Sequence, residues 1–268
     1  MKIRTKSFHP LTVKLIFAVF LLGIWEFIAK AKLLGPNSEL IFPSLEAILR
    51  AFVDNFSRGY AGSSLWIYIG NSMQLLLKGL CIGILGALLL SGLSMISSTF
   101  YEIYNLLVSV FDLLPGVALL PVVIVIFGVK PGVIVFLVVH AVIWPMSRSI
   151  LDGFRSVPRI YIEAGQNIGL KGISLLGGVY LPASVTYIVS GLKVAWARAW
   201  RGLISAEMIF GVASCPGIGL FINQMRTNMK NAEMYATLIV IILIGVIVQY
   251  GILEPIEDHT VKKWGMNR

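Results

Sequence analysis

The stretch IYNLLVSVFDLLPGVALLPVVIVIFGVKPGVIVFLVVHAVIWPMSRSI, residues 103–150, decides the fold class. It holds two apolar runs, 103–128 and 132–150, which only the segment Val129-Lys130-Pro131 joins. Because about 20 apolar residues in a helix cross the hydrocarbon core of a bilayer, each run is long enough to be a membrane span. So short a connection predicts a tight helical hairpin in the membrane.

The rest of the chain repeats this pattern. Further apolar runs cover residues 12–29, 74–96, 184–210 and 236–253, so six spans are expected. Of 268 residues, 57% are hydrophobic and 13% are charged, and the mean hydropathy is +0.86. A water-soluble domain needs more charge on its surface. We therefore predict an all-α membrane protein, a bundle of about six helices in which residues 1–268 form one transmembrane domain.

The first span shares some features with a signal peptide. Lys2, Arg4 and Lys6 precede it, and Ala29-Lys30-Ala31 loosely resembles a processing site. Its apolar run, however, exceeds the roughly 7–15 residues of a signal peptide, and Glu26 fits poorly beside such a site. The pattern favours an uncleaved span.

The formal charge of +9 does not indicate nucleic-acid binding, because Lys and Arg lie mostly between the apolar runs rather than on one face. Such residues orient membrane proteins instead. With the N-terminus inside, the cytoplasmic side carries Lys2, Arg4, Lys6, Arg148, Arg155, Arg159, Lys171, Lys262, Lys263 and Arg268. The outer side keeps Lys30, Lys32, Arg50, Arg58, Lys130, Arg226 and Lys230. We expect a multi-pass protein of the bacterial inner membrane with both termini in the cytoplasm.

Three connections are longer than turns. Residues 30–73 are expected outside and contain PSLEAILRAFVDNF, a short amphipathic helix with Ser44 as its N-cap. Residues 211–235 are also expected outside, and residues 151–183 inside.

The second span has small residues at every fourth position, namely Gly79, Gly83, Ala87 and Ser91. Such a face lets another helix approach closely. Packing within this chain is the favoured interpretation, and dimerisation through this face is the alternative.

The inner connection is too polar to cross a bilayer. Pro158 can occupy the first position of a helix, along which Ile160, Ala164 and Ile168 recur at helical spacing. Gly169 follows, at the position where a residue in the left-handed conformation would end the helix. A second short helix, about 173–180, is expected to end against Pro182. The pattern predicts a helix–Gly–helix element on the cytoplasmic face.

A motif lies in this element. Glu163-Ala164-Gly165, three residues, Gly169, nine residues, and Val179-x-Leu181-Pro182 resemble the "EAA" loop of ABC-importer permeases, whose pattern is EAA, three residues, G, nine residues, I-x-LP. Gly165 stands in place of the third Ala and Val179 in place of Ile, with the spacing intact. A motif stays a hypothesis until its structural context is known.

The resemblance extends over almost the whole chain and is to permeases of the nitrate/sulfonate/taurine type. It includes Trp25-Glu26, Phe42-Pro43-Ser44, Leu114-Pro115 through Pro121 to Phe127-Gly128, Ala206-Glu207-Met208 and Gly217-Ile218-Gly219.

The resemblance implies the type I importer fold and a path for a small anionic solute such as a sulfonate, taurine or nitrate. It implies a homodimer, two ATPase subunits that bind the ATP, and an extracytoplasmic solute-binding protein. Loop 152–182 would couple to the ATPase through Glu163, Ala164, Gly165, Gly169, Leu181 and Pro182. The plainer alternative makes Glu163 a solvated charge and Gly169 a helix stop.

Charged residues in the fifth span form a second candidate site. Arg198, Arg201 and Glu207 lie well inside it, and a charge near the bilayer centre costs about 2.5–3.5 kcal/mol on insertion scales. Arg198 and Arg201 lie about 60° apart on the helix and can line a path together, which would favour an anion. Alternatively, the arginines pair with Glu207, Asp112 or a carbonyl and only hold helices.

The third and fourth spans contain further candidates. Pro115 and Pro121 remove backbone donors and tend to kink a helix, which can mark a moving wall of the path, although membrane helices also tolerate proline. His140 is expected to be packed and hydrogen-bonded rather than a proton relay.

Enzymatic motifs are absent from the sequence. It has no G-x-x-x-x-G-K-[ST], HExxH or GxSxG, and its cysteines, Cys81 and Cys215, show no metal-ligand spacing. We predict a transport subunit with no cofactor or metal of its own. One rival is an ion-gradient-driven secondary transporter, against which the lack of paired half-repeats counts. The other is an intramembrane enzyme using Asp112, His140 and Glu207.

Overall fold

The computed structural model describes residues 10–32, 35, 38–60 and 62–261. Within these ranges all regular elements are helices, and one isolated bridge joins Tyr60 to Ser63. The all-α prediction is confirmed. The terminal charges used for orientation, Lys2, Arg4, Lys6, Lys262, Lys263 and Arg268, lie outside the described residues.

The helices fall into two compact units. The first unit combines Met1–Leu65 with Ile222–Val240, and the second combines Trp66–Phe221 with Ile241–Arg268. A single domain over residues 1–268 stays a prediction.

In the first unit, α1 (Pro10–Lys30) holds the turn between α2 (Ser38–Ile41) and α3 (Leu45–Ser57). The Trp25 indole nitrogen donates to the Pro43 carbonyl at 3.0 Å. The Glu26 carboxylate accepts from the Leu45 backbone N–H at 2.8 Å. The two motifs Trp25-Glu26 and Phe42-Pro43-Ser44 therefore meet, and Glu26 supplies an acceptor at the start of α3.

The predicted amphipathic helix is α3. Its N-cap is Ser44, whose hydroxyl accepts from the Ala47 N–H at 3.2 Å, as predicted. Its apolar face buries Ile48 and Ala51 against Ala236 of α13 (Asn231–Val248). This contact ties α3 to the start of the last long helix.

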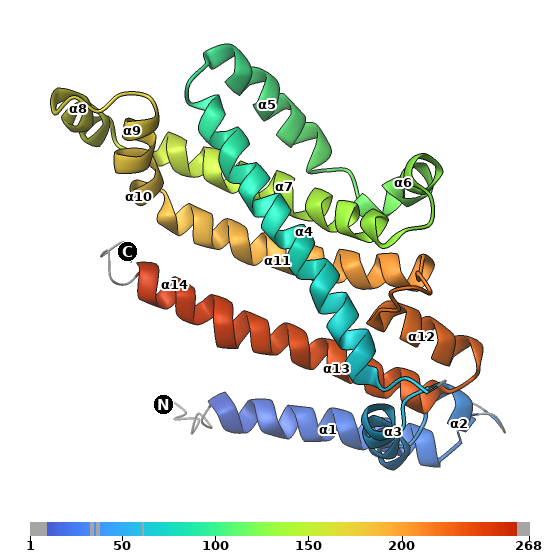
Figure 1. Ribbon diagram of the computed structural model, residues 1–268. Coiled ribbons are helices and arrows are strands. Elements are labelled where there is room, and N and C mark those ends of the chain that lie inside the picture. The colour runs from blue at the N-terminus through green and yellow to red at the C-terminus, as the bar shows by residue number, and fades with distance from the viewer. Residues whose placement is uncertain (1–9, 33–34, 36–37, 61, 262–268) are drawn as a thin grey trace, which may run out of the picture. The chain divides into compact units, whose positions relative to one another are not determined.

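The second unit is centred on α7 (Pro131–Ser156) and α11 (Val185–Ile209), which lie side by side (Figure 1). Small residues allow this approach, because a Cβ at Gly191 would lie 2.6 Å from the Ser149 Cβ. α4 (Leu65–Ser94) packs on α7 in the same way, since a Cβ at Gly83 would lie 2.7 Å from Val142. A Cβ at Gly79 would lie similarly close to Val138. The small face of the second span therefore packs within the chain.

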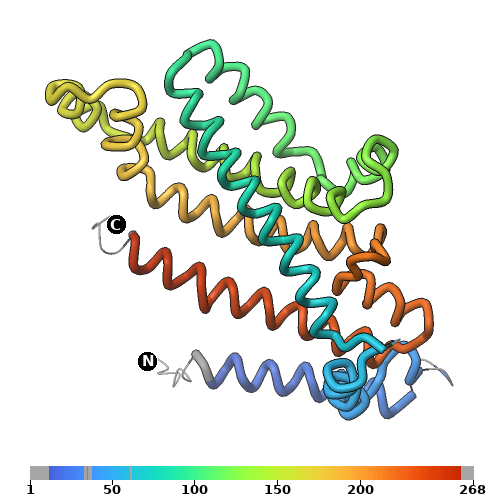
Figure 2. Tube along the Cα trace, viewed as in Figure 1, coloured from blue at the N-terminus to red at the C-terminus, as the bar shows by residue number. Residues whose placement is uncertain are grey.

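The third span is broken. α5 (Ser98–Phe111) and the helical stretch of η1 (Gly116–Leu119) and α6 (Leu120–Phe127) meet at 91° (Figure 2). At about 1.5 Å per residue, neither half reaches the roughly 30 Å of the hydrocarbon core. Pro115 is the N-cap of η1, and Pro121 lies at the start of α6. The prolines thus begin helical segments instead of kinking one continuous helix.

Among the described residues, four helices are long and apolar enough to cross a membrane, or up to six if each of two bent pairs is one span. Several predicted ends were wrong: the second span begins at Leu65, the fourth continues to Ser156, and the last begins at Asn231. Apolar composition marks the part of a helix that lipid surrounds, whereas these helices continue into polar turns. The last helix runs through η3 (Gln249–Leu253) into α14 (Glu254–Val261). There Glu257 pairs with Lys193 at 2.5 Å.

Candidate functional site

A cavity of about 260 Å³ lies in the second unit, at the break in the third span. The non-helical residues Asp112–Pro115 form one wall, and α7 and α11 form the others. Irregular backbone at membrane depth occurs where it is buried in protein or lines a water-filled cavity. The side chains that matter for its chemistry are Asp112, His140, Trp144, Arg198 and Arg201.

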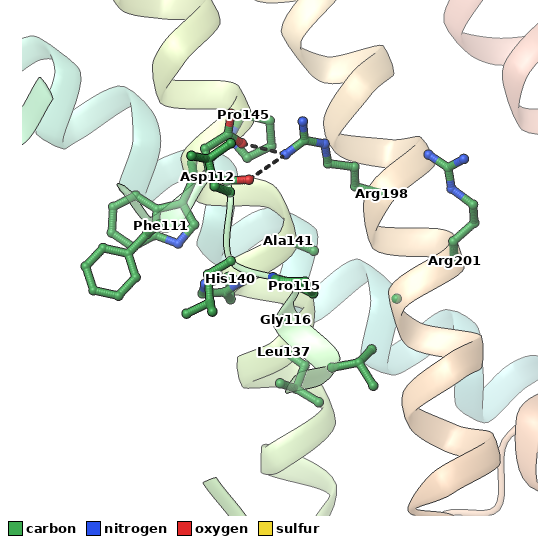
Figure 3. Close-up of a pocket in the computed structure, with 15 residues that line it drawn as sticks. Phe111, Asp112, Pro115, Gly116, Leu137, His140, Ala141, Pro145, Arg198 and Arg201 are labelled. Carbon is green, nitrogen blue, oxygen red and sulfur yellow. Dashed lines mark hydrogen bonds and ion pairs between the residues drawn. The ribbon is translucent and has the colours of Figure 1, made fainter. Parts of the chain in front are cut away.

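Asp112, at the end of α5, contacts both α7 and α11 at this cavity, and Figure 3 shows its contact with Arg198 of α11. Its side chain is 10% exposed, and it accepts from Arg198 at 2.5 Å and from the Arg148 Nε at 3.1 Å. Two guanidiniums therefore share one carboxylate, which leaves one net positive charge. For Arg198 the structure therefore shows the alternative given above, in which the arginine pairs with Asp112 and holds helices together.

Arg201 differs from Arg198. Its Nε donates to the Ala197 carbonyl at 2.9 Å, and no carboxylate pairs with it in the described part of the chain. Arg201 lines the cavity, and it also borders a second hollow of about 590 Å³ beside Trp200 and Gly245. Both arginines line one cavity, as their 60° spacing predicted, but of the two only Arg198 pairs with an acidic side chain among the described residues.

His140 is packed, as expected, but it is not hydrogen-bonded. It is 8% exposed, and among the described residues neither ring nitrogen has a partner. The indole nitrogen of Trp144, one helical turn later, is buried and equally without a partner within the described ranges. The expectation of a satisfied histidine was therefore wrong.

Glu207 does not line this cavity. It is 1% exposed, and its carboxylate accepts from the Ser72 hydroxyl at 2.8 Å and from the Gly219 N–H at 2.9 Å. Nine residues separate it from Arg198, which places the two about 180° apart around the helix. This geometry favours a holding role for Glu207 over a place in the path.

The loop 152–182 forms α8 (Arg159–Asn167), α9 (Ile173–Leu175), η2 (Leu176–Tyr180) and α10 (Leu181–Ala183), beyond the ends of α7 and α11 (Figure 1). Gly169 has φ +91°, the predicted left-handed stop. The second helical piece does not end before Pro182. It continues to Ala183, because Pro182 stands in the first turn of α10, where no N–H is needed.

The two departures from the EAA pattern meet in this loop. A Cβ at Gly165 would lie 2.8 Å from a methyl carbon of Val179. Gly165 and Val179 are each smaller than the residue in the pattern, so α8 approaches η2 closely. Beside this contact lies an apolar hollow of about 770 Å³ bordered by Tyr161, Ala164 and Pro182.

The loop also exposes apolar side chains at its surface. Ile160, Ile168 and Ile173 are 68%, 78% and 76% exposed, and Glu163 is exposed beside them. Exposed apolar side chains of this kind are available for contact with another protein or with a membrane.

Comparison with known proteins agrees with this geometry. Residues 79–256 match the family of the binding-protein-dependent transport system inner membrane component. The chain belongs to this family. It is 24% identical to the taurine transport system permease protein of Escherichia coli, covering 87% of this chain and 82% of that one. It is 26% identical to a nitrate import permease protein of Leptolyngbya laminosa, covering 85% and 80%.

The protein is thus the permease subunit of an ABC importer and a multi-pass inner-membrane protein. Such a subunit works with an ATPase and a solute-binding protein. The family match supports the ABC permease over its rival, the gradient-driven transporter. Of the residues named for an intramembrane enzyme, Asp112 and His140 share the cavity, and Glu207 is absent from its lining.

Sequence reasoning missed two residues of this ABC permease's cavity region. Arg148 was counted as a cytoplasmic charge, but it binds Asp112, and Trp144 was not considered. His140, Trp144 and Arg148 are spaced by four, so they share one face of α7. That spacing could have revealed the polar face.

Proposed function

We propose that this ABC permease forms the translocation path for a small anionic solute, such as a sulfonate, taurine or nitrate. The supporting observation is the charge at the cavity, which Arg198 and Arg201 line and where Arg148 and Arg198 share the carboxylate of Asp112. Fixed cations along a path favour anions. The taurine and nitrate relatives agree with this proposal.

Arg201→Gln tests the anionic cargo. A hydrogen bond to a charged group contributes about 1.5–3 kcal/mol, so uptake of taurine or nitrate should fall roughly tenfold or more. Assembly with the ATPase should be unaffected, because Arg201 has no ion pair to lose among the described residues. Uptake into proteoliposomes is the measurement. Arg50→Gln is the control, since Arg50 lies in α3 and pairs on the surface with Glu46. Equal uptake by both variants would return Arg201 to a structural role.

We further propose that the loop 152–182 couples this chain to the ATPase through Glu163, Ala164, Gly165, Gly169, Leu181 and Pro182. The exposed isoleucines and the apolar hollow support this assignment. In this proposal the partner ATPase binds the ATP, this chain binds no cofactor, and two copies of the permease form the path. The mass of the purified complex, measured by light scattering, tests the copy number.

Both termini are proposed to be cytoplasmic, and cysteine labelling tests this orientation. Asn55, in the connection expected outside, is not a suitable labelling site, because it is 3% exposed and bonds to Glu233 and Thr237. Arg58 has an 85% exposed side chain and replaces it. In a chain with Cys81 and Cys215 changed to serine, Arg58→Cys should react with an impermeant thiol reagent in intact cells. Lys171→Cys should react only after the inner face is opened, and the reverse pattern would overturn the orientation.

A further inference from the structure

We propose that the cavity at the break of the third span is an oxoanion-binding site to which the His140 imidazole and the Trp144 indole donate hydrogen bonds. The class of ligand is a sulfonate or nitrate. The inference rests on the proposed function, in which the cargo is an anion, and it adds the residues that recognise the anion's oxygens.

The first observation is the unused polar atoms. His140 is more than nine-tenths buried, and neither of its ring nitrogens has a partner in the described residues. The Trp144 indole nitrogen is also buried and has no hydrogen-bond partner in the described residues. Both side chains line the cavity. Buried polar groups in native proteins are nearly always hydrogen-bonded, so two neighbouring exceptions in one cavity indicate a ligand.

The second observation is that the site carries hydrogen-bond donors and a net positive charge. An indole N–H can only donate, and a neutral imidazole donates from one of its two nitrogens. Arg148, Arg198 and Arg201 bring three positive charges against one from Asp112. A ligand with several acceptor oxygens and a negative charge matches both features, whereas a cation would meet the excess positive charge.

The third observation is how firmly the two rings are held. Trp144 stacks on Phe111 with ring centroids 5.0 Å apart, and it meets the His140 ring edge-on at 6.1 Å. His140 also lies against η1, at the bend of the third span. A Cβ at Gly116 would be 3.2 Å from the His140 Nδ1 (Figure 3). Donors fixed in advance bind an anion with little loss of side-chain freedom.

The size of the cavity agrees with such a ligand. Its volume is about 260 Å³, and a water molecule takes about 30 Å³ in the liquid. The cavity thus has room for an ion with its oxygens directed at several donors. Water alone in the cavity is the competing explanation.

Thermal unfolding of the purified permease–ATPase complex tests the site. The probes are taurine, ethanesulfonate and nitrate, added separately without the binding protein, because a ligand that binds only the folded state raises the melting temperature. The parent complex should be stabilised by at least one probe. His140→Phe keeps a ring and removes both nitrogens, so the probe concentration for half-maximal stabilisation should rise roughly tenfold or more. Trp144→Phe should act in the same direction, and His140→Asn, which keeps a donor, should recover part of the affinity.

Tyr104→Phe is the matched control. Tyr104 is also buried, but its hydroxyl bonds to Ser147 at 2.5 Å and it does not line the cavity. It should leave the anion response unchanged. The inference is overturned if His140→Phe responds like the parent, or if no probe stabilises the parent, in which case the cavity holds water only. Uptake of the same anions by the parent complex tests the proposed function separately, since that uptake can succeed while the His140 variants bind normally.

Discussion

Gly169→Val should separate the permease from its ATPase while leaving membrane insertion intact. Gly169 has φ +91°, and a Cβ there would have nothing within 4 Å, so the effect comes from the backbone and not from a clash. A branched residue in this conformation is strained by about 1–3 kcal/mol. The loop can relieve the strain only by moving α8 relative to α9, which changes the surface that holds Glu163. We expect weak co-purification of the ATPase and loss of cargo-stimulated hydrolysis in proteoliposomes, with normal permease yield.

The loop supplies a control for this experiment. Gly177 also has open space where its Cβ would be, but its φ is not positive. Gly177→Val should therefore couple far better than Gly169→Val. Glu163→Lys reverses an exposed charge on α8 without backbone strain and should repeat the loss. If Gly169→Val and Glu163→Lys both bind and stimulate the ATPase like the parent, the coupling assignment is wrong.

Features that depend on neighbouring residues were readable from the sequence. The Ser44 cap needs only the N–H three residues later, and the Gly169 stop needs only a residue that tolerates positive φ. The small face of the second span follows from spacing alone. These features were predicted because their physical cause lies within one or two helical turns.

The break in the third span has a different origin. Pro115 and Pro121 indicated a distorted helix, but at the 91° bend the Asp112 carboxylate also accepts from Arg148 and Arg198, which lie 36 and 86 residues away. Such partners are invisible to periodicity. The unpaired nitrogens of His140 were missed for the same reason, since burial and pairing are properties of the packed bundle.

The early start of the second span has a similar cause. Ser72 is too polar to count toward an apolar run, yet it is fully buried in α4 because Glu207 accepts from its hydroxyl. Its oxygen in turn accepts from the Ile218 N–H at 2.9 Å. A buried polar group is tolerated where its bonds are satisfied. Here the partners lie more than a hundred residues away in the chain, so composition alone starts the span too late.

Gly219→Ala should unfold this region of the second unit and abolish transport. A Cβ at residue 219 would lie 2.6 Å from the Glu207 Cβ and 2.8 Å from the Met208 nitrogen, and it would also meet the Ile204 carbonyl oxygen. Backbone atoms of α11 cannot move aside as a flexible side chain can. Overpacking of a tight core costs about 1–3 kcal/mol. Displacing the Gly219 N–H from the buried carboxylate removes a further charge-assisted bond of about 1.5–3 kcal/mol.

We expect a lower melting temperature and a lower yield of purified Gly219→Ala permease. Ser72→Ala, which removes one donor to the same carboxylate without adding an atom, should show a smaller loss in the same direction. Gly132→Ala is the control. Its Cβ would have nothing within 4 Å, so this variant should have the melting temperature of the parent. If Gly219→Ala and Gly132→Ala have the same melting temperature, hydrogen bonds to Glu207 do not hold the loop after α11 in place. In that case Glu207 would regain its predicted place among the candidates for the path, because a buried carboxylate that holds no neighbouring segment needs another reason to be there.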